Sequence, residues 1–286
     1  MTRLKRAART HIDNFKKYRF LLRELVGKNI KLQYRNSVLG VFWTFLQPLL
    51  MMIVLSFVFM QVFGKDSSQT GNYPVYLLCG RLLYQFFTSA TKRAMTSIRR
   101  QASMIKKVYV PKYIYPLSEV LSAFVTFLIS LTVLAVVIAY FDIRNSDPVH
   151  VTWRVVFVVV PILITLVLSL GVGMILATVS VFFKDVENIY DVFTTLLFYM
   201  SPIVYRPSML NFEEGSIQLR VLKANPLYGL IGEFRAAIMY GDEVLRPWSQ
   251  SWDMNLMYYA AGFAVATVII GFLLFYRNQD KFILYI

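Results

Sequence analysis

The feature that most constrains this chain is a run of 26 uncharged, mostly apolar residues, Val38–Phe63. As a helix rising ~1.5 Å per residue it would measure roughly 39 Å, which exceeds the ~30 Å hydrocarbon core of a bilayer. Five more apolar segments follow, at 74–90, 117–141, within 154–183, at 189–205 and at 255–276. The pattern predicts an all-α integral membrane protein with six transmembrane helices, formed by a domain over 38–286.

Composition agrees with a membrane protein and leaves little for enzymatic chemistry. Residues are 57% hydrophobic and 16% charged, and the chain has one cysteine and two distant histidines. No phosphate-binding G-x-x-x-x-G-K-[ST] loop, HExxH or CxxC motif occurs. We therefore expect no catalytic residues, no metal site and no cofactor in this chain.

The distribution of basic residues predicts the orientation. The two ends and the segments 91–116 and 184–188 carry 21 Lys/Arg, whereas the opposite segments carry 8. Basic residues favour the cytoplasmic side, so both termini should be cytoplasmic in a multi-pass protein of the cytoplasmic membrane. This distribution explains the net charge of +14 by membrane orientation, so we expect no nucleic-acid partner.

Two cytoplasmic segments have helical amphipathic patterns. In 1–37 an apolar face is opposed by a polar face that includes Lys17, Glu24 and Lys28, which predicts an interface helix. In the loop 91–116, Ala102, Ile105 and Val108 recur at helical spacing until Pro111. The cations around them are Arg99, Arg100, Lys106 and Lys107. The loop is either a set of ordinary lipid-facing anchors or a short helix that docks into a partner's groove.

A few charges fall at or near membrane depth. Arg81 lies in the second apolar segment, where a cation either lines a polar path or extends to the interface. The external segment 206–254 contains an apolar stretch with Glu233 and Arg235, too short and too charged to span. It is either a re-entrant helix or an external cap on the headgroups.

Four segments in order carry a family resemblance: IKLQYRNSVLGVFWTFLQPLL (30–50), IKKVYVPKYIYPLSEVLS (105–122), FFKDVENIYDVFTTLLFYMSPIVY (182–205) and NPLYGLIGEFRAAIMYG (225–241). Together they resemble the membrane subunit of bacterial type-two ABC exporters of lipid-linked polysaccharide, O-antigen, capsule or teichoic acid. Arg81 departs from the family pattern, in which an apolar residue after the glycine is more usual.

The resemblance implies a homodimeric pore with two copies of a separate ATPase chain that binds ATP and Mg. It implies that Arg99, Arg100, Ile105, Lys106 and Lys107 couple to that ATPase, beside the interface helix. Lys31 and Arg35 are the candidate ligands of the lipid-linked headgroup, and Arg81, Glu233 and Arg235 are candidates for an external gate. The candidate stacking surfaces along the path are Phe42, Trp43, Phe86, Phe87 and Tyr199. Two alternatives remain open, a stand-alone secondary transporter and a membrane enzyme of lipid-linked sugars.

Overall fold

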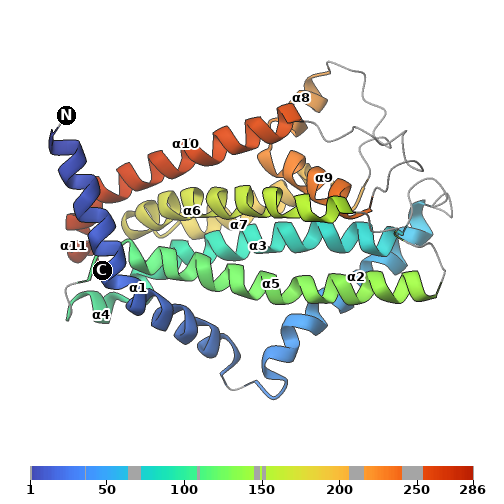
Figure 1. Ribbon diagram of the computed structural model, residues 1–286, viewed down its shortest axis with the longest axis horizontal. Coiled ribbons are helices and arrows are strands. Elements are labelled where there is room, and N and C mark those ends of the chain that lie inside the picture. Colours follow the sequence, from blue (N-terminus) through green and yellow to red (C-terminus); the bar gives the residue numbers. More distant parts are fainter. Residues whose placement is uncertain are drawn as a thin grey trace.

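Long helices lie side by side along one axis of the molecule (Figure 1). The computed structural model describes residues 2–35, 37–63, 72–107, 110–144, 149, 153–205, 216–239 and 254–285, with side chains except those of 2–17, 60–63 and 154. Within these ranges every regular element is helical and none is a strand. The helices along this axis are α3 (Tyr73–Arg100), α5 (Ile114–Ile143), α6 (Val159–Phe182) and α10 (Met254–Asn278). The helix α2 (Trp43–Phe63) runs obliquely to them and contacts α3 and α5 (Figure 1).

The two ends of this bundle differ. Both termini lie at one end, which we call the basal end, where α1 (Thr2–Tyr34) crosses the bundle and α4 (Ala102–Ile105) is found (Figure 1). At the opposite, distal end lie α8 (Ile217–Lys223) and α9 (Pro226–Met239). The shorter α7 (Val186–Met200) packs against α3 and α6.

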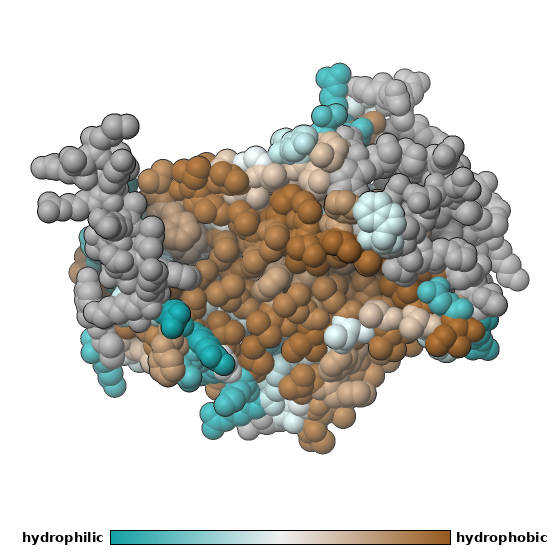
Figure 2. All heavy atoms as spheres, in the orientation of Figure 1, coloured by the Kyte–Doolittle hydropathy of each residue, from teal (hydrophilic) through white to brown (hydrophobic). Residues whose placement is uncertain are grey.

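Four of the six predicted spans are confirmed as helices long and apolar enough to cross a membrane. They are Gly40–Phe59, Ile114–Ile143, Val155–Phe182 and Met254–Tyr285. A belt of apolar atoms covers the face formed by α5, α6 and α10, with polar atoms at its two ends (Figure 2). The other two predicted segments form α3, which carries several charges, and α7, which has only 15 residues.

The second apolar segment extends further than its hydropathy predicts. The segment was expected to end near Ala90, but α3 continues to Arg100 as one helix of 28 residues. Its polar residues beyond Ala90 remain helical because Ala94 and Ile98 are fully buried against neighbouring helices. One helix therefore runs from the distal end of the bundle to the basal end.

The short helix expected around Ala102, Ile105 and Val108 is confirmed only in part, and it does not include Arg99 and Arg100. Arg99 and Arg100 form the last turn of α3, the chain turns at Gln101, and α4 contains only Ala102–Ile105. The turn allows Ile98 of α3 and Ile105 of α4 to join the same buried apolar cluster, which a straight continuation would separate. Lys106 and Lys107 follow in an exposed turn, and Val108 lies outside the described residues.

The first span begins later than Val38. The interface helix expected within 1–37 is α1, which runs from Thr2 to Tyr34, after which the short helix η1 (Gly40–Phe42) leads into α2. Val38 is fully exposed, and Gly40 has φ +50°, a left-handed conformation that side-chain-bearing residues rarely adopt. This conformation separates α1 from α2, and the two helices meet at an angle (Figure 1).

Small residues on α6 allow close helix packing. A Cβ on Gly171 would lie 2.5 Å from the backbone nitrogen of Val268 in α10. A Cβ on Gly173 would lie 2.9 Å from the Cβ of Ala94 in α3. The helix α6 thus contacts two neighbours at backbone distance, which holds the bundle together without large side chains.

Candidate functional site

A row of polar side chains follows α3 at intervals of four residues: Arg81, Gln85, Ser89 and Arg93. Residues four apart lie on one face of a helix, so these side chains form a polar row. All four are partly buried, whereas the other faces of α3 are mostly buried and apolar. Polar side chains at this depth in an apolar bundle need polar partners or polar space beside them.

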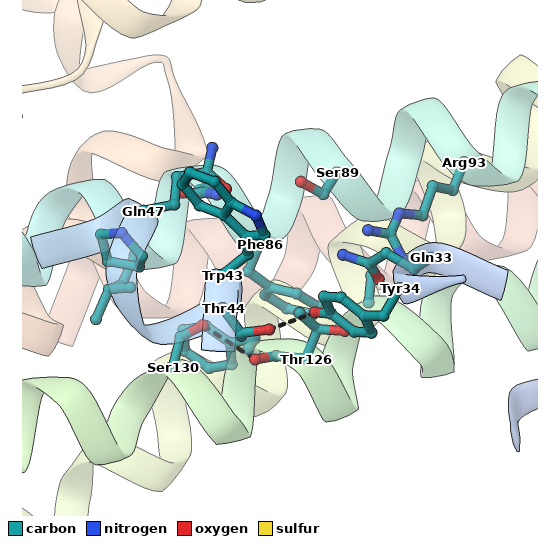
Figure 3. A pocket seen from close by; sticks show the side chains of 15 residues that line it. Gln33, Tyr34, Trp43, Thr44, Gln47, Phe86, Ser89, Arg93, Thr126 and Ser130 are labelled. Atoms are coloured by element: carbon teal, nitrogen blue, oxygen red, sulfur yellow. Dashed lines mark hydrogen bonds between the residues drawn. The ribbon is translucent and has the colours of Figure 1, made fainter. Parts of the chain in front are cut away.

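A first cavity of about 220 Å³ opens on one side of this row (Figure 3). Amides, hydroxyls and aromatic rings alternate around it, with one guanidinium, that of Arg93. The lining residues are Gln33 and Tyr34 of α1; Trp43, Thr44, Gln47 and Pro48 of α2; Leu82, Gln85, Phe86, Ser89 and Arg93 of α3; and Ala123, Thr126, Phe127 and Ser130 of α5. We call it the α1–α2 cavity.

The walls of the α1–α2 cavity are held in position by contacts among the lining residues and by one contact beside them. The Tyr34 and Thr44 hydroxyls are hydrogen bonded to each other, which joins α1 to α2. Asn29 Nδ2 lies 3.5 Å from Ser118 Oγ and connects α1 to α5. Phe86 stacks on Phe127 with ring centroids 4.9 Å apart. The cavity is therefore preorganised on three of its sides.

A second, more open cavity of about 450 Å³ lies on the other side of the row, between α3 and α7. It contains two cations, three aromatic rings and several hydroxyls, and it shares Ser89 with the first cavity. Its lining residues are Arg81, Tyr84, Thr88, Ser89 and Lys92 of α3 and Thr194, Thr195, Phe198 and Tyr199 of α7. Polar space thus flanks both sides of the row on α3.

Ion pairs and hydrogen bonds connect α3 to α7 on the basal side of this second cavity. Lys92 Nζ lies 2.7 Å from Asp191 Oδ1, and Arg99 pairs with Glu187. The hydroxyls of Thr91 and Tyr190 are 2.6 Å apart. Asp191 of α7 therefore has a charged partner in α3.

At the distal end, Arg235 of α9 holds three segments together. Its guanidinium donates to the carbonyl oxygens of Tyr76 (3.0 Å), Pro202 and Ile203 (3.0 Å), and stacks 3.5 Å from the Tyr76 ring centroid. The side chain is only 2% exposed. Gly80 leaves room for this group, because a Cβ there would lie 2.2 Å from Nη2 of Arg235.

The basal surface carries the predicted coupling residues. Arg100, Lys106 and Lys107 are exposed, Arg99 is partly buried, and Ile105 packs into the basal apolar cluster. This cluster also contains Leu22 and Leu25 of α1 and Phe282 of α11 (Phe282–Tyr285). The predicted interface helix and the coupling segment thus share one apolar core.

The C-terminal segment also contacts the segment that follows α4. Lys112 Nζ donates to the backbone oxygen of Gln279 at 2.5 Å and lies 6.0 Å from the Phe282 ring centroid. Burial lowers the pKa of the Lys112 ammonium, and the nearby Asp280 carboxylate opposes this shift. The end of the chain therefore helps to position the loop that carries the basal cations.

The other predicted site residues fall into several places. Trp43 and Phe86 line the α1–α2 cavity, and Arg81 and Tyr199 line the second cavity. Phe42 is exposed, whereas Phe87, Glu233 and Arg235 are buried. On α1, Glu24, Lys28 and Lys31 are exposed, and Arg35 is exposed directly after the helix end. Lys31 and Arg35 line neither cavity, and the side chain of Lys17 is not among those that the structure describes.

Sequence reasoning missed the polar residues of the row itself. Gln85, Ser89 and Arg93 were not proposed, although their four-residue spacing from Arg81 was readable in the sequence. Gln33 and Tyr34 were also missed, because only the fold brings the end of α1 to the same cavity as residues of α2, α3 and α5.

Comparison with known proteins agrees with this architecture. Residues 21–239 match the model of the ABC-2 type transporter family. The chain is 31% identical over 220 residues to the O-antigen export system permease protein RfbA of Myxococcus xanthus, covering 77% of this chain and 80% of the relative. It is 27% identical over 262 residues to an RfbA of Klebsiella pneumoniae (92% and 93% covered), and 23% identical over 273 residues to the polysialic acid transport protein KpsM of Escherichia coli (94% and 97% covered). The chain belongs to the ABC-2 type transporter family, as a membrane permease subunit.

Proposed function

We propose that this permease exports a lipid-linked surface polysaccharide of the O-antigen or capsule kind across the bacterial cytoplasmic membrane. The observation that carries the proposal is the polar row on α3, flanked by two cavities with hydroxyl, amide and aromatic linings. Such a lining suits sugars, which offer hydroxyl groups and one apolar face per ring. The names of the relatives, O-antigen and polysialic acid transport proteins, support the same substrate class.

The working assembly is a homodimer with two copies of an ATPase chain, which bind ATP and Mg. The basal end faces the cytoplasm, because the basic residues are concentrated there. The docking surface for the ATPase is formed by Arg99, Arg100, Lys106 and Lys107, beside Glu24 and Lys28 of α1. The buried Ile105 anchors this segment in the basal apolar cluster. Their positive charge complements an acidic groove and speeds assembly.

Six segments cross the membrane in this proposal: α2, α3, α5, α6, α7 and α10. The helices α3 and α7 fall below the usual requirement for a span in apolar content or in length, as expected for helices that face a polar path. In the dimer, the polar row on α3 faces the second copy across this path. Trp43, Phe86 and Tyr199 offer stacking surfaces along it, with Phe42 near its start and Phe87 supporting it from the core.

The distal helix α9 is a re-entrant helix that closes the external exit. With 14 residues it would be roughly 21 Å long, too short to span, and it is buried against α3, α6 and α10. Non-spanning backbone at membrane depth is tolerated where it packs against protein. Glu233 and Arg235 keep this closure in place, with Arg81 below it.

The test is co-expression with a candidate ATPase chain from the same genome, followed by purification in lipid. We expect a stable complex whose ATPase activity changes when a polyprenyl-linked glycan is added. Charge reversal of Lys106 and Lys107 should weaken ATPase binding, whereas Lys223→Glu at the distal end should not. Purification of this chain alone, with transport that needs no ATPase, would contradict the proposal and favour a stand-alone transporter.

A further inference from the structure

We propose that the α1–α2 cavity binds the phosphate or pyrophosphate group of the lipid-linked substrate, with Arg93 as its principal ligand and Gln33 and Tyr34 beside it. This inference rests on the proposed function. The headgroup site then lies in a cavity inside the fold and not at the exposed residues Lys31 and Arg35.

The charge distribution at the basal end of the cavity favours an anion. Arg93 extends from α3 toward Gln33 and Tyr34 of α1 (Figure 3). Its guanidinium makes no hydrogen bond or ion pair with any other residue that the structure describes. Its charged neighbours are Glu119, which is 7% exposed, and Arg100. One carboxylate facing two guanidinium groups leaves a net positive charge.

Guanidinium is the side-chain group best suited to a phosphate. Its planar fork donates two parallel hydrogen bonds to a pair of phosphate oxygens. The amide of Gln33 and the hydroxyl of Tyr34 line the same end of the cavity. An arginine held at a cavity wall with its donors unused is therefore ready to bind an anion without displacing an existing partner.

The rest of the lining suits the first sugar attached to that phosphate. Gln85 Oε1 is buried without a hydrogen-bond partner among the described residues, so it can accept a bond from a hydroxyl. Trp43 and Phe86 supply ring faces on which a sugar can stack. The volume of about 220 Å³ lies below the ~300 Å³ at which pockets for whole ligands begin, so the cavity takes one group of a longer molecule.

Lys31 and Arg35 differ from Arg93 in exposure. Lys31 is exposed on α1, Arg35 is exposed directly after its end, and neither lines the cavity. Exposed charges act at a distance and are screened beyond ~8 Å at physiological salt, so they attract an anionic headgroup without fixing its position. Arg93 fixes the headgroup, because its neighbours hold the cavity wall in place.

The experiment uses the complex of this permease with its ATPase partner in phosphatidylcholine nanodiscs. Undecaprenyl pyrophosphate without glycan is titrated, and ATPase stimulation is measured together with retention of the lipid by native mass spectrometry. We expect Arg93→Gln to raise the half-saturating concentration at least tenfold, as loss of a charge-assisted bidentate contact should. We expect the half-saturating concentration of Arg93→Lys to lie between those of the unchanged protein and Arg93→Gln. Maximal ATPase stimulation should be retained at saturating lipid.

The matched control is Arg277→Gln, which removes an exposed arginine at the basal end of α10. Its titration should match that of the unchanged protein. If Arg93→Gln also matches it, the cavity is not the headgroup site, and the proposed function stands as long as the glycan-linked lipid still stimulates the ATPase. If the glycan-linked lipid has no effect on the unchanged complex, the proposed function fails and this inference fails with it.

Two sources of phosphate are separated by a second set of nanodiscs that contain phosphatidylglycerol. Retention of undecaprenyl pyrophosphate in the presence of excess phosphatidylglycerol, lost in Arg93→Gln, supports the assignment to the substrate. Retention of phosphatidylglycerol itself with the same dependence on Arg93 would assign the site to an ordinary lipid and overturn it.

Discussion

The two ends of α3 are held by different chemistry. At the distal end, one buried guanidinium donates to three backbone carbonyls of α3 and of the turn after α7. At the basal end, α3 is joined to α7 by two partly exposed ion pairs and one hydroxyl contact. Buried charges are costly to unpair, whereas exposed pairs contribute little. The distal contact therefore acts as a fixed joint and the basal contact as an adjustable one.

This difference fits a permease that is driven from one end. An ATPase docked at the basal surface would move the end of α3 and α4, where the contacts with α7 can break and re-form at low cost. The distal end would stay assembled around α9. The predictions below test this contrast.

The largest effect is expected from Arg235→Leu. The substitution leaves three carbonyl oxygens without their donor in a dry environment and removes the stacking on Tyr76. We expect the free energy of unfolding to fall by about 3 kcal/mol or more, measured by SDS titration of the purified protein. Arg220→Leu, at an exposed position of the distal helix α8, is the control and should change little.

Arg235→Lys sharpens the same test. Lysine keeps the charge but lacks the planar fork, so it can satisfy fewer of the three carbonyls. Its stability should lie between those of the unchanged protein and Arg235→Leu. Equal stability of all three proteins would show that the distal joint is not what holds α9 to α3.

The next effect concerns Gly80. A Cβ there would lie 2.2 Å from Nη2 of Arg235, and the guanidinium cannot withdraw without losing its carbonyl partners. We expect Gly80→Ala to lower the free energy of unfolding by about 2 kcal/mol. Gly232→Ala makes the same change on α9 where no atom lies within 4 Å, and it should be neutral or slightly stabilising.

A double substitution tests whether the two residues act together. In the Arg235→Leu background, Gly80→Ala should cost less, since the clashing group is gone. Strictly additive effects would mean that Gly80 is needed for some other contact.

A smaller effect is expected at the hydroxyl contact between α3 and α7. Thr91 donates its proton to the carbonyl of Phe87, so Tyr190 must donate to Thr91 Oγ1. Tyr190→Phe removes this single bond and leaves Thr91 satisfied, which should cost about 1 kcal/mol of unfolding free energy. The control is Tyr258→Phe, at an exposed tyrosine of α10. A cost near that of Arg235→Leu would contradict the contrast between the two ends.

The sequence predicted those parts of the molecule that depend on local pattern. Hydropathy alone located α2, α5, α6 and α10, because each must present an apolar surface along its length. The end of α3 was misjudged, because its polar last turns are kept helical by the burial of Ala94 and Ile98 against other helices. The turn at Gln101 was also missed, because it depends on the burial of Ile98 and Ile105 in one apolar cluster, which the local sequence pattern does not indicate.

The site depends on contacts between residues far apart in the chain. Arg235 was predicted near an external gate, but its partners Tyr76 and Pro202 lie 159 and 33 residues away, and no local pattern indicates them. The pairing of Lys92 with Asp191 likewise joins two different helices and could not be predicted from the sequence pattern. By contrast, the row from Arg81 to Arg93 follows a helical period, and a search for polar residues at that period inside an apolar segment would have found it.

The smallest effect is expected for the pair of Arg99 and Glu187. Arg99→Glu and Glu187→Arg each place like charges together, and each should lower the free energy of unfolding by about 0.5 kcal/mol, because the partners are partly exposed and screened by water. The exchanged double variant should recover stability, and 0.5 M salt should reduce all three differences. If ATPase coupling is lost in both single variants and restored in the exchanged one, the pair acts through α7. If the exchange restores stability but not coupling, Arg99 also contacts the ATPase directly, and the adjustable joint and the docking surface then share one residue.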